Sequence, residues 1–356
     1  MEVIDSYRPP KNAYSPLFKF KTSRESMSSI IFGIDIGGSL VKLSIVMKKT
    51  ETKAKDYFIS KKIFEMVEEK DNYLFLTLYQ TESFFMEIQS MIEEVKNFTK
   101  VDTVQATGGG AFKFKDFCKE KFNITLEKHD ELISLVRGYL FFNSFNSLYK
   151  IEGINQIDFV SQSDLVFPHL AVNIGSGVSI LKVDSPDNKD IHRVAGTIMG
   201  GGTLIGLSKI LIGVDKYSEI NELAKHGDYR NTDYTMKDVF NIVGGQFSDD
   251  DFHVASSMAK IQEYINLKTI DKCKKEDIAL SLLIIICNHI AQISCLTARQ
   301  YGVKEILIFG NFSRRGSQAV FLLNQGFQYF DKSLKIRFNY YDGYSGTVGV
   351  LIEKRQ

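Results

Sequence analysis

The chain has 356 residues, more than one ordinary domain needs and enough for two. Its apolar share of 44% and charged share of 24% are typical of a globular protein. With 44 basic and 43 acidic residues the formal net charge is +1, which argues against a protein whose main work is coating nucleic acid or an anionic membrane. We therefore expect neither a nucleic-acid partner nor a membrane partner.

The four cysteines form no CxxC pair, so no zinc-ribbon or thioredoxin pattern is present. Cys287 and Cys295 lie in an apolar helical stretch and are expected to be small core residues. The longest apolar run, Leu282–Cys287, is far shorter than the roughly 18 residues of a membrane span, and no signal-peptide pattern opens the sequence. We expect a cytoplasmic protein.

Residues 1–27 are polar, contain three of the five prolines and show no periodicity, which predicts a flexible leader. A buried strand is predicted at 30–35, followed by a tight glycine turn and a second strand at 40–48. The rest of this half is predicted to hold strands at 55–60, 73–79 and 101–107, a triple-glycine turn at 108–110, and helices at 83–98 and 130–142.

Residues 143–167 are polar and irregular and are interpreted as a domain boundary or a surface insertion. The opening pattern then returns at 170–183 as strand, glycine-serine turn and strand. Next come a glycine cluster opening a helix within 192–207, a helix at 276–301 ending at Gly302, strands at 305–312 and 335–341, and a final helix within 342–354. The repeated unit predicts two related halves facing each other across a cleft.

The segment DIGGSLVK (35–42) joins an aspartate at a strand end to a glycine hairpin. Gly37 and Gly38 would let backbone amides approach phosphate oxygens, and Ser39 could donate a hydrogen bond to them. Lys42 could present a positive charge, and Asp35 could bind Mg²⁺ directly or through water. The structural alternative is a hairpin that needs glycine only for its turn.

Two further glycine turns lie in the second half. NIGSGVS places Gly175, Ser176 and Ser179 on one turn, where the alternative for a serine beside glycine is a capping role. In RVAGTIMGGGT, Gly201 and Gly202 open a helix whose N-terminus could face an anion. Arg193 lies upstream, where its guanidinium could bind a carboxylate or phosphate unless it is an ordinary surface charge.

The segment LEKHDELISLVRG places Glu131 in the first turn of a predicted helix. A carboxylate in this position could act as a general base toward an alcohol. The alternative is an acidic first turn that complements the helix dipole. His129 is interpreted as structural.

One nucleoside triphosphate held between two lobes would account for all the glycine turns together. The sequence contains no GxxxxGK[ST] and no GxGxxG opening a βαβ unit, so neither a P-loop enzyme nor a Rossmann dehydrogenase fits.

Over residues 30–352 the chain resembles eukaryotic-type (type II-like) pantothenate kinases of the actin/Hsp70/sugar-kinase superfamily. The resemblance rests on an ordered set of segments: DIGGSLVKL, ATGGGAFKF, DELISLVRG, VNIGSGVSIL, RVAGTIMGGGTLIGL, GGQF with VASSM, IFGNFSR and GYSGTVGVL. It implies an α/β fold with two RNase-H-like (actin-like ATPase) domains facing across an ATP cleft. The domains would be 28–150, with the phosphate-binding hairpin and the catalytic glutamate, and 151–356, with the pantothenate, acyl-CoA and adenosine sites and the dimer helices.

The implied activity is ATP-dependent phosphorylation of the primary hydroxyl of pantothenate to 4'-phosphopantothenate, the first step of coenzyme A biosynthesis. Glu131 would be the base, and Asp35 would assist and organise Mg²⁺. Ser176, Ser179 and Arg193 would contact pantothenate and acyl-CoA. The implied ATP and phosphate contacts are Gly37, Gly38, Ser39, Lys42, Gly175, Gly201, Gly202, Gly310 and Asn311.

The resemblance also implies a dimer, made with itself or with a paralogue, and feedback inhibition by acetyl-CoA or another acyl-CoA. Two alternatives remain open: a non-catalytic regulatory subunit of a hetero-oligomeric kinase, and a different sugar-kinase-like enzyme such as an amino-sugar kinase. The sequence departs from the family pattern at Ser39, where threonine is usual, at Ile198, where a serine is usual, and in a shortened acidic stretch at 248–253.

Overall fold

A computed structural model describes most of the chain. The described residues are 12–13, 18–21, 30–38, 40–60, 65–69, 71–80, 101–152, 156–160, 165–243, 253–266, 273–341 and 343–354. Ser39 and the helix predicted at 83–98 lie outside them, as does nearly all of the acidic stretch at 248–253.

The first sheet is built around the predicted hairpin. Counting described strands, its order is β1 (Asn12–Ala13), β5 (Glu65–Glu69), β6 (Asn72–Gln80), β4 (Leu40–Lys48), β3 (Ile30–Ile36), β7 (Thr103–Thr107) and β8 (Thr125–Lys128). β3 pairs antiparallel with β4 and parallel with β7, which pairs parallel with β8. Both faces are apolar, so the sheet is covered on both sides.

The second sheet repeats this arrangement. Its described strands run β10 (Gln156–Phe159), β9 (Leu148–Glu152), β17 (Lys335–Asn339), β16 (Glu305–Phe309), β11 (His169–Ile174), β12 (Val178–Val183) and β13 (Ile191–Thr197). The antiparallel run β11-β12-β13 and the parallel run β11-β16-β17 match β3-β4-β6 and β3-β7-β8. The predicted α/β class with two RNase-H-like units is therefore confirmed.

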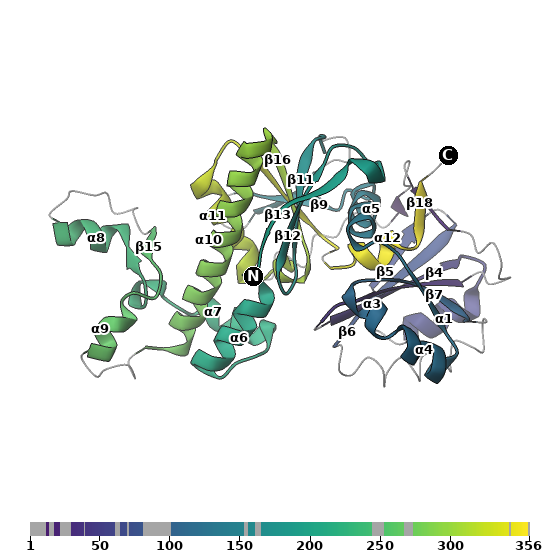
Figure 1. Cartoon of the computed structure of the whole chain (residues 1–356), viewed down its shortest axis with the longest axis horizontal. Coiled ribbons are helices and arrows are strands. Elements are labelled where there is room, and N and C mark those ends of the chain that lie inside the picture. Colours follow the sequence, from purple (N-terminus) through teal and green to yellow (C-terminus); the bar gives the residue numbers. More distant parts are fainter. Residues whose placement is uncertain are drawn as a thin grey trace.

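Helices cover these sheets and join them (Figure 1). In the first half lie α1 (Thr52–Ser60), α3 (Gly109–Lys113), α4 (Lys115–Phe122) and α5 (Glu131–Asn143). In the second lie α6 (Gly201–Ile212), α7 (Tyr217–Lys225), α8 (Met236–Val243), α9 (Ile261–Asn266), α10 (Lys275–Tyr301), α11 (Gln318–Phe330) and α12 (Ser345–Gly349). Short strands β14 (Tyr234–Thr235) and β15 (Val254–Ser256) pair with each other, and β2 (Phe18–Phe20) pairs with β18 (Ile352–Lys354).

The longest helix, α10, ends as predicted at Gly302, which has the left-handed φ of 66°. Among described helices it is the one long and apolar enough to cross a membrane by length and composition, a property that the short apolar run did not reveal. In the structure 67% of its most apolar window is buried, and α6, α7 and α11 pack against it. This burial is what the core helix of a folded domain shows. Cys287 and Cys295 are buried in it, as predicted.

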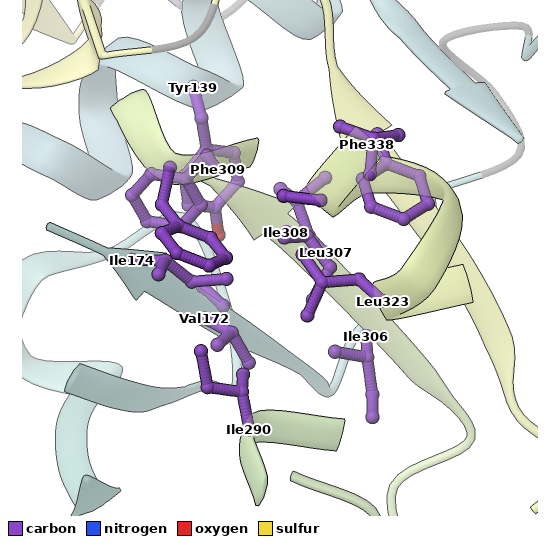
Figure 2. Close-up of a cluster of buried hydrophobic side chains, with 14 of the residues drawn as sticks. Tyr139, Val172, Ile174, Ile290, Ile306, Leu307, Ile308, Phe309, Leu323 and Phe338 are labelled. Carbon is purple, nitrogen blue, oxygen red and sulfur yellow. The ribbon is translucent and has the colours of Figure 1, made fainter. Parts of the chain in front are cut away.

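The largest core belongs to the second unit but receives residues from α5. Figure 2 shows Tyr139 of α5 beside the strand residues Val172, Ile174 and Phe309. The Tyr139 ring lies 5.6 Å from that of Phe309, and its hydroxyl lies 2.6 Å from His169 Nε2. Burial lowers the pKa of His169 to about 4, so its ring is neutral and can share this hydrogen bond. The helix that starts at the first sheet is thus anchored in the second unit.

Two predicted elements were wrong. Residues 55–60 belong to helix α1 and not to a strand, because the buried pair is Ala54 and Phe58, four residues apart, while Ile59 is exposed. The final helix is only α12, since Ile352 and its neighbours leave it to pair with β2.

The polar stretch at 143–167 also contributes structure, because its strands β9 and β10 extend the second sheet. The second sheet therefore begins at Leu148, before the proposed boundary at 151. Within the predicted leader, residues 18–20 form strand β2 and Phe20 is buried.

The helices α5 and α12 cross at very short range. A methyl group on Gly138 would lie 1.8 Å from the Ser345 carbonyl oxygen, and one on Gly349 would lie 1.7 Å from the Ser134 carbonyl oxygen. Because the atoms met at both contacts are backbone atoms, a larger side chain could fit only if one helix moved away from the other. Figure 1 shows the two helices side by side between the sheets.

We predict that Gly138→Ala destabilises the fold by about 4 kcal/mol or more, since the added methyl group overlaps backbone that cannot rotate away. The matched control is Gly206→Ala in α6, where nothing lies within 4 Å of the new methyl group. That control should gain roughly 0.5–1 kcal/mol from helix propensity. Chemical denaturation of both variants measures the difference, and equal stabilities would contradict the close crossing.

Candidate functional site

An ion pair lies at the end of the first hairpin. Asp35 of β3 and Lys42 of β4 are directly opposite in register, and Lys42 Nζ lies 3.1 Å from Asp35 Oδ2. Both side chains are mostly buried, at 11% and 15% exposure. On its other side Asp35 pairs in register with Thr107 of β7. The predicted carboxylate and ammonium groups are therefore brought together.

Parallel strands explain why Glu131 belongs to the same group. β3, β7 and β8 run parallel, so their carboxyl ends meet at one edge of the sheet. Asp35 lies at the end of β3, and α5 begins with Glu131 directly after β8. The Asp130 side chain caps the helix by accepting the Ile133 N–H at 2.9 Å. Glu131 is thus fixed in the first turn, as predicted.

The pKa of Glu131 is raised above its usual value. Partial burial of the carboxyl group is the largest cause, and the negative charge of Asp35 adds to it. Lys42 opposes the shift, while Asp130 raises the pKa and Lys128 lowers it. Glu131 is nevertheless an exposed residue, which leaves it open to a substrate. A carboxyl group with a raised pKa is suited to accept a proton from an alcohol.

Glycines from two segments line the Asp35 carboxylate. Gly108 has φ 83°, and a methyl group there would lie 2.6 Å from Asp35 Oδ1. A methyl group on Gly346, in α12, would lie 3.0 Å from Asp35 Oδ2. The triple-glycine turn and the GYSGT segment therefore need glycine at these two positions to pack against this carboxylate. From the sequence, Gly108 is predicted only as part of a glycine turn, and Gly346 has no predicted role.

The second hairpin contacts the N-terminus of α6. The Gly201 amide donates to the Gly175 carbonyl oxygen and the Gly202 amide to that of Ser176, both at 2.9 Å. The Gly37 amide likewise donates to the Leu40 carbonyl oxygen at 2.9 Å. Because these amides are already used, a phosphate role for these glycines would rest on their small size and not on amide donation.

Gly310 and Asn311 link the second hairpin to α12. Gly310 has φ 107°, and a methyl group there would lie 2.4 Å from the Ile174 carbonyl oxygen. A methyl group on Gly343 would lie 2.2 Å from Asn311 Oδ1. The segment 343–346 thus contacts Asn311 at one end and Asp35 at the other. Glycine turns from both units are therefore joined through one short segment.

Arg193 lies on β13 with an exposed guanidinium group. A methyl group on Gly196 would lie 3.0 Å from Arg193 Nη2, so the guanidinium occupies the space above that glycine. Gly196 pairs in register with Ser179, which places the Ser179 side chain on the same face. Within the described part of the chain no carboxylate pairs with Arg193. Ser176 is exposed at the adjoining turn.

Helix α5 connects the group around Asp35 and Glu131 with the strand that carries Arg193. The helix that begins with Glu131 also contacts β13, the strand that carries Arg193. Across the described ranges no cluster of three or more histidine, cysteine, aspartate or glutamate side chains could hold a metal ion. A single carboxylate such as Asp35 fits Mg²⁺, which usually keeps several waters and takes other ligands from substrate phosphates.

Comparison with known protein families identifies the family to which the chain belongs. Residues 31–353 match the model of the Fumble family. The chain belongs to this family.

Curated relatives agree with this assignment. The chain is 31% identical over 337 residues to a pantothenate kinase of Schizosaccharomyces pombe, and the match covers 90% of this chain and 81% of that protein. It is 36% identical over 253 residues to pantothenate kinase 1 of Arabidopsis thaliana, covering 69% and 64% of the two chains. It is also 30% identical over 343 residues to a 4'-phosphopantetheine phosphatase of Mus musculus, where it covers 90% of this chain but only 40% of the mouse protein.

We predict that the Glu131 carboxyl titrates above the 4.5 of an ordinary glutamate. Lys42→Met should raise its pKa further, because a nearby positive charge is lost, and Asp35→Asn should lower it. Carbon NMR of the labelled carboxyl group measures the midpoint, with the exposed Lys119→Met as control. If the titration midpoint of Glu131 is the same in Lys42→Met as in the wild type, Lys42 does not act on the Glu131 carboxyl as inferred.

Proposed function

We propose that the chain is an ATP-dependent pantothenate kinase that transfers the γ-phosphoryl group of ATP to the primary hydroxyl of pantothenate. The observation that carries the proposal is Glu131, held at the start of α5 within electrostatic reach of the Asp35–Lys42 pair. Relatives named pantothenate kinase support the substrate.

Glu131 acts as the general base. Its carboxylate accepts the proton of the pantothenate hydroxyl as that oxygen attacks the γ-phosphorus, and ADP leaves from the opposite side. The fixed first turn of α5 supplies the positioning on which phosphoryl transfer mainly depends. After transfer the proton remains on Glu131 until it exchanges with solvent.

Arg193 binds the carboxylate of pantothenate. Its guanidinium is exposed, lies over Gly196 and has no carboxylate partner in the described residues. Ser179, on the same face, and Ser176, in the turn, can donate hydrogen bonds to the same ligand. A planar guanidinium fork recognises a carboxylate through two parallel bonds, which suits the acidic end of pantothenate.

ATP phosphates would lie near Lys42 and the glycine turns, with the nucleoside toward Gly310 and Asn311. Asp35 would hold Mg²⁺, because its carboxylate has one ammonium partner and is lined by two glycines that place no side chain against it. Bound Mg²⁺ would neutralise charge on the transferring phosphoryl group. We extend the proposal to a cytoplasmic dimer inhibited by acyl-CoA, as the family resemblance implies.

The non-catalytic alternative is not favoured. A subunit without activity has no need to keep a base, an anion-binding arginine and a buried ion pair at the positions that the family resemblance implies for them. Asp35, Lys42 and Glu131 are present and lie within electrostatic reach of one another, and Arg193 is present on β13. The decisive experiment incubates the purified chain with labelled pantothenate and MgATP, with and without acetyl-CoA. Formation of 4'-phosphopantothenate supports the proposal, and its absence under all conditions overturns it.

We predict that Glu131→Gln lowers kcat by about 10²–10⁴ while ATP binding persists, because only proton acceptance is removed. Glu120→Gln, an exposed change on α4, is the control and should leave turnover unchanged. Steady-state kinetics and nucleotide titration separate the two effects. Near-normal turnover of the Glu131 variant would remove this residue from the mechanism.

We predict that Arg193→Met mainly raises the KM for pantothenate, by about 10–100-fold, because a charge-assisted bond to the substrate carboxylate is lost. Arg193→Lys should recover part of the affinity. Lys209→Met, on the surface of α6 and paired with Asp215, is the matched charge control. A rise confined to the KM for ATP would show that the pocket is assigned to the wrong substrate.

A further inference from the structure

A short N-terminal segment is fixed to the C-terminal strand. Strand β2 pairs antiparallel with β18, and the Lys21 amide donates to the Leu351 carbonyl oxygen at 2.8 Å. Phe20 is buried, with its ring centroid 5.2 Å from that of Phe141 in α5. Residues 18–21 are therefore held against both β18 and α5, and we call them the clasp.

The clasp directs the Lys21 side chain toward the first sheet. Lys21 Nζ lies 3.3 Å from Gln105 Oε1 on β7 and 3.4 Å from His129 Nε2. Burial is the largest cause of a lowered Lys21 pKa, opposed mainly by Glu127. Burying an ammonium group costs free energy unless polar atoms receive it. Gln105 Oε1 accepts from this ammonium group, and His129 Nε2 lies beside it.

Gln105 is held in one orientation. Its Nε2 donates to Glu127 Oε2 at 2.7 Å, which leaves Oε1 facing His129 Nε2 at 2.6 Å. Since Oε1 can only accept, His129 donates through Nε2–H, and Lys21 donates to the same oxygen. The hydrogen bonds therefore assign the tautomer of His129 and fix its ring.

His129 immediately precedes the cap of α5. Its amide donates to the Ala106 carbonyl oxygen at 2.8 Å, and Thr107 Oγ1 donates to its carbonyl oxygen at 3.3 Å. Asp130 follows as the helix cap, and Glu131 follows Asp130. The side chain and the backbone of His129 are thus both restrained two residues before the proposed base.

We propose that Lys21 and Gln105 are positioning residues for Glu131, acting through His129 at the start of α5. The inference rests on the proposed function, because Glu131 is the base in that reaction. The clasp makes a segment outside both sheets part of the support of the active site. Both residues would act through His129 and would not contact the substrate.

The charges around His129 are consistent with this arrangement. Burial is the largest cause of its lowered pKa, Lys21 and Arg137 lower it further, and Glu127 raises it. With Lys21 in place the ring stays neutral to lower pH, which preserves a single tautomer near Glu131. Loss of Lys21 should therefore raise the pKa of His129 as well as loosen its ring.

The test compares Lys21→Met with Lys19→Met. Lys19 lies in the same segment, two residues earlier on β2, but its contact is an exposed pair with Glu353 at 3.4 Å. Lys21→Met should lower kcat about tenfold with little change in either KM, since misplacement of a base affects chemistry more than binding. Lys21→Arg should recover part of the rate, and Lys19→Met should change nothing.

Two readouts do not need activity. The His129 ring, followed by proton NMR, should titrate at higher pH in Lys21→Met than in the wild type. Hydrogen exchange should be faster at the amides of Ile133 and Ser134, which bond to Asp130 at 2.9 and 3.0 Å. If Lys21→Met does not fold, Gln105→Met, of similar shape, removes the hydrogen bonds of Lys21 and His129 to Oε1 and should also speed exchange at these amides.

The outcomes separate this inference from the proposed function. A wild-type chain without kinase activity refutes the function, and the NMR and exchange results then decide alone whether the clasp orders the start of α5. If the His129 titration and the amide exchange are both unchanged in Lys21→Met, the inference that the clasp orders the start of α5 is wrong. A kcat within twofold of wild type, in an active enzyme, overturns the positioning role.

Discussion

The crossing of α5 and α12 is the contact on which the rest of the structure depends. α5 follows β8, the last parallel strand of the first sheet, yet its Tyr139 is buried in the second unit. α12 follows β17, the last parallel strand of the second sheet, yet it contacts β3, β4 and β7. Each unit thus sends one helix to the other. The two helices can exchange in this way only because Gly138 and Gly349 let their backbones meet.

This exchange determines where the charged groups lie. α12 brings Gly346 against Asp35, and α5 brings Glu131 to the same sheet edge. The negative charge of Asp35 raises the pKa of Glu131, and without a nearby cation Glu131 would hold its proton more tightly. Lys42, paired with Asp35, opposes that effect on Glu131. The site therefore combines a base of raised proton affinity with a cation that limits the rise.

The sequence predicted secondary structure best where spacing and capping residues within a few positions determine it. The hairpin at 30–48, the helix beginning with Glu131 and the end of α10 at Gly302 were each predicted from spacing and caps that lie within a few residues. The strand predicted at 55–60 failed because six residues of mixed polarity fit both periods, and only the buried pair four residues apart decides for a helix.

Contacts between distant segments could not be read in this way. Ser44 donates to the Thr347 carbonyl oxygen at 2.7 Å across 303 positions, and no local pattern in either segment predicts it. Lys21 was assigned to a leader because residues 1–27 lack periodicity, although its side chain reaches Gln105. The glycines of GYSGTVGV carried the family resemblance, but their role as the surface against Asp35 and α5 required the fold.

These long-range contacts also constrain the order in which the site can form. A methyl group on Gly33 would lie 2.3 Å from the Thr347 carbonyl oxygen, so the face of β3 that carries Asp35 is completed by α12. The strands of the first sheet are all in place before residue 130, whereas α12 and β18 lie after residue 344. Pairing over such separations is entropically costly and slow. We therefore expect the grouping of Asp35 with its glycine neighbours to form late in folding, after the second unit has placed β17 where α12 can reach the first sheet.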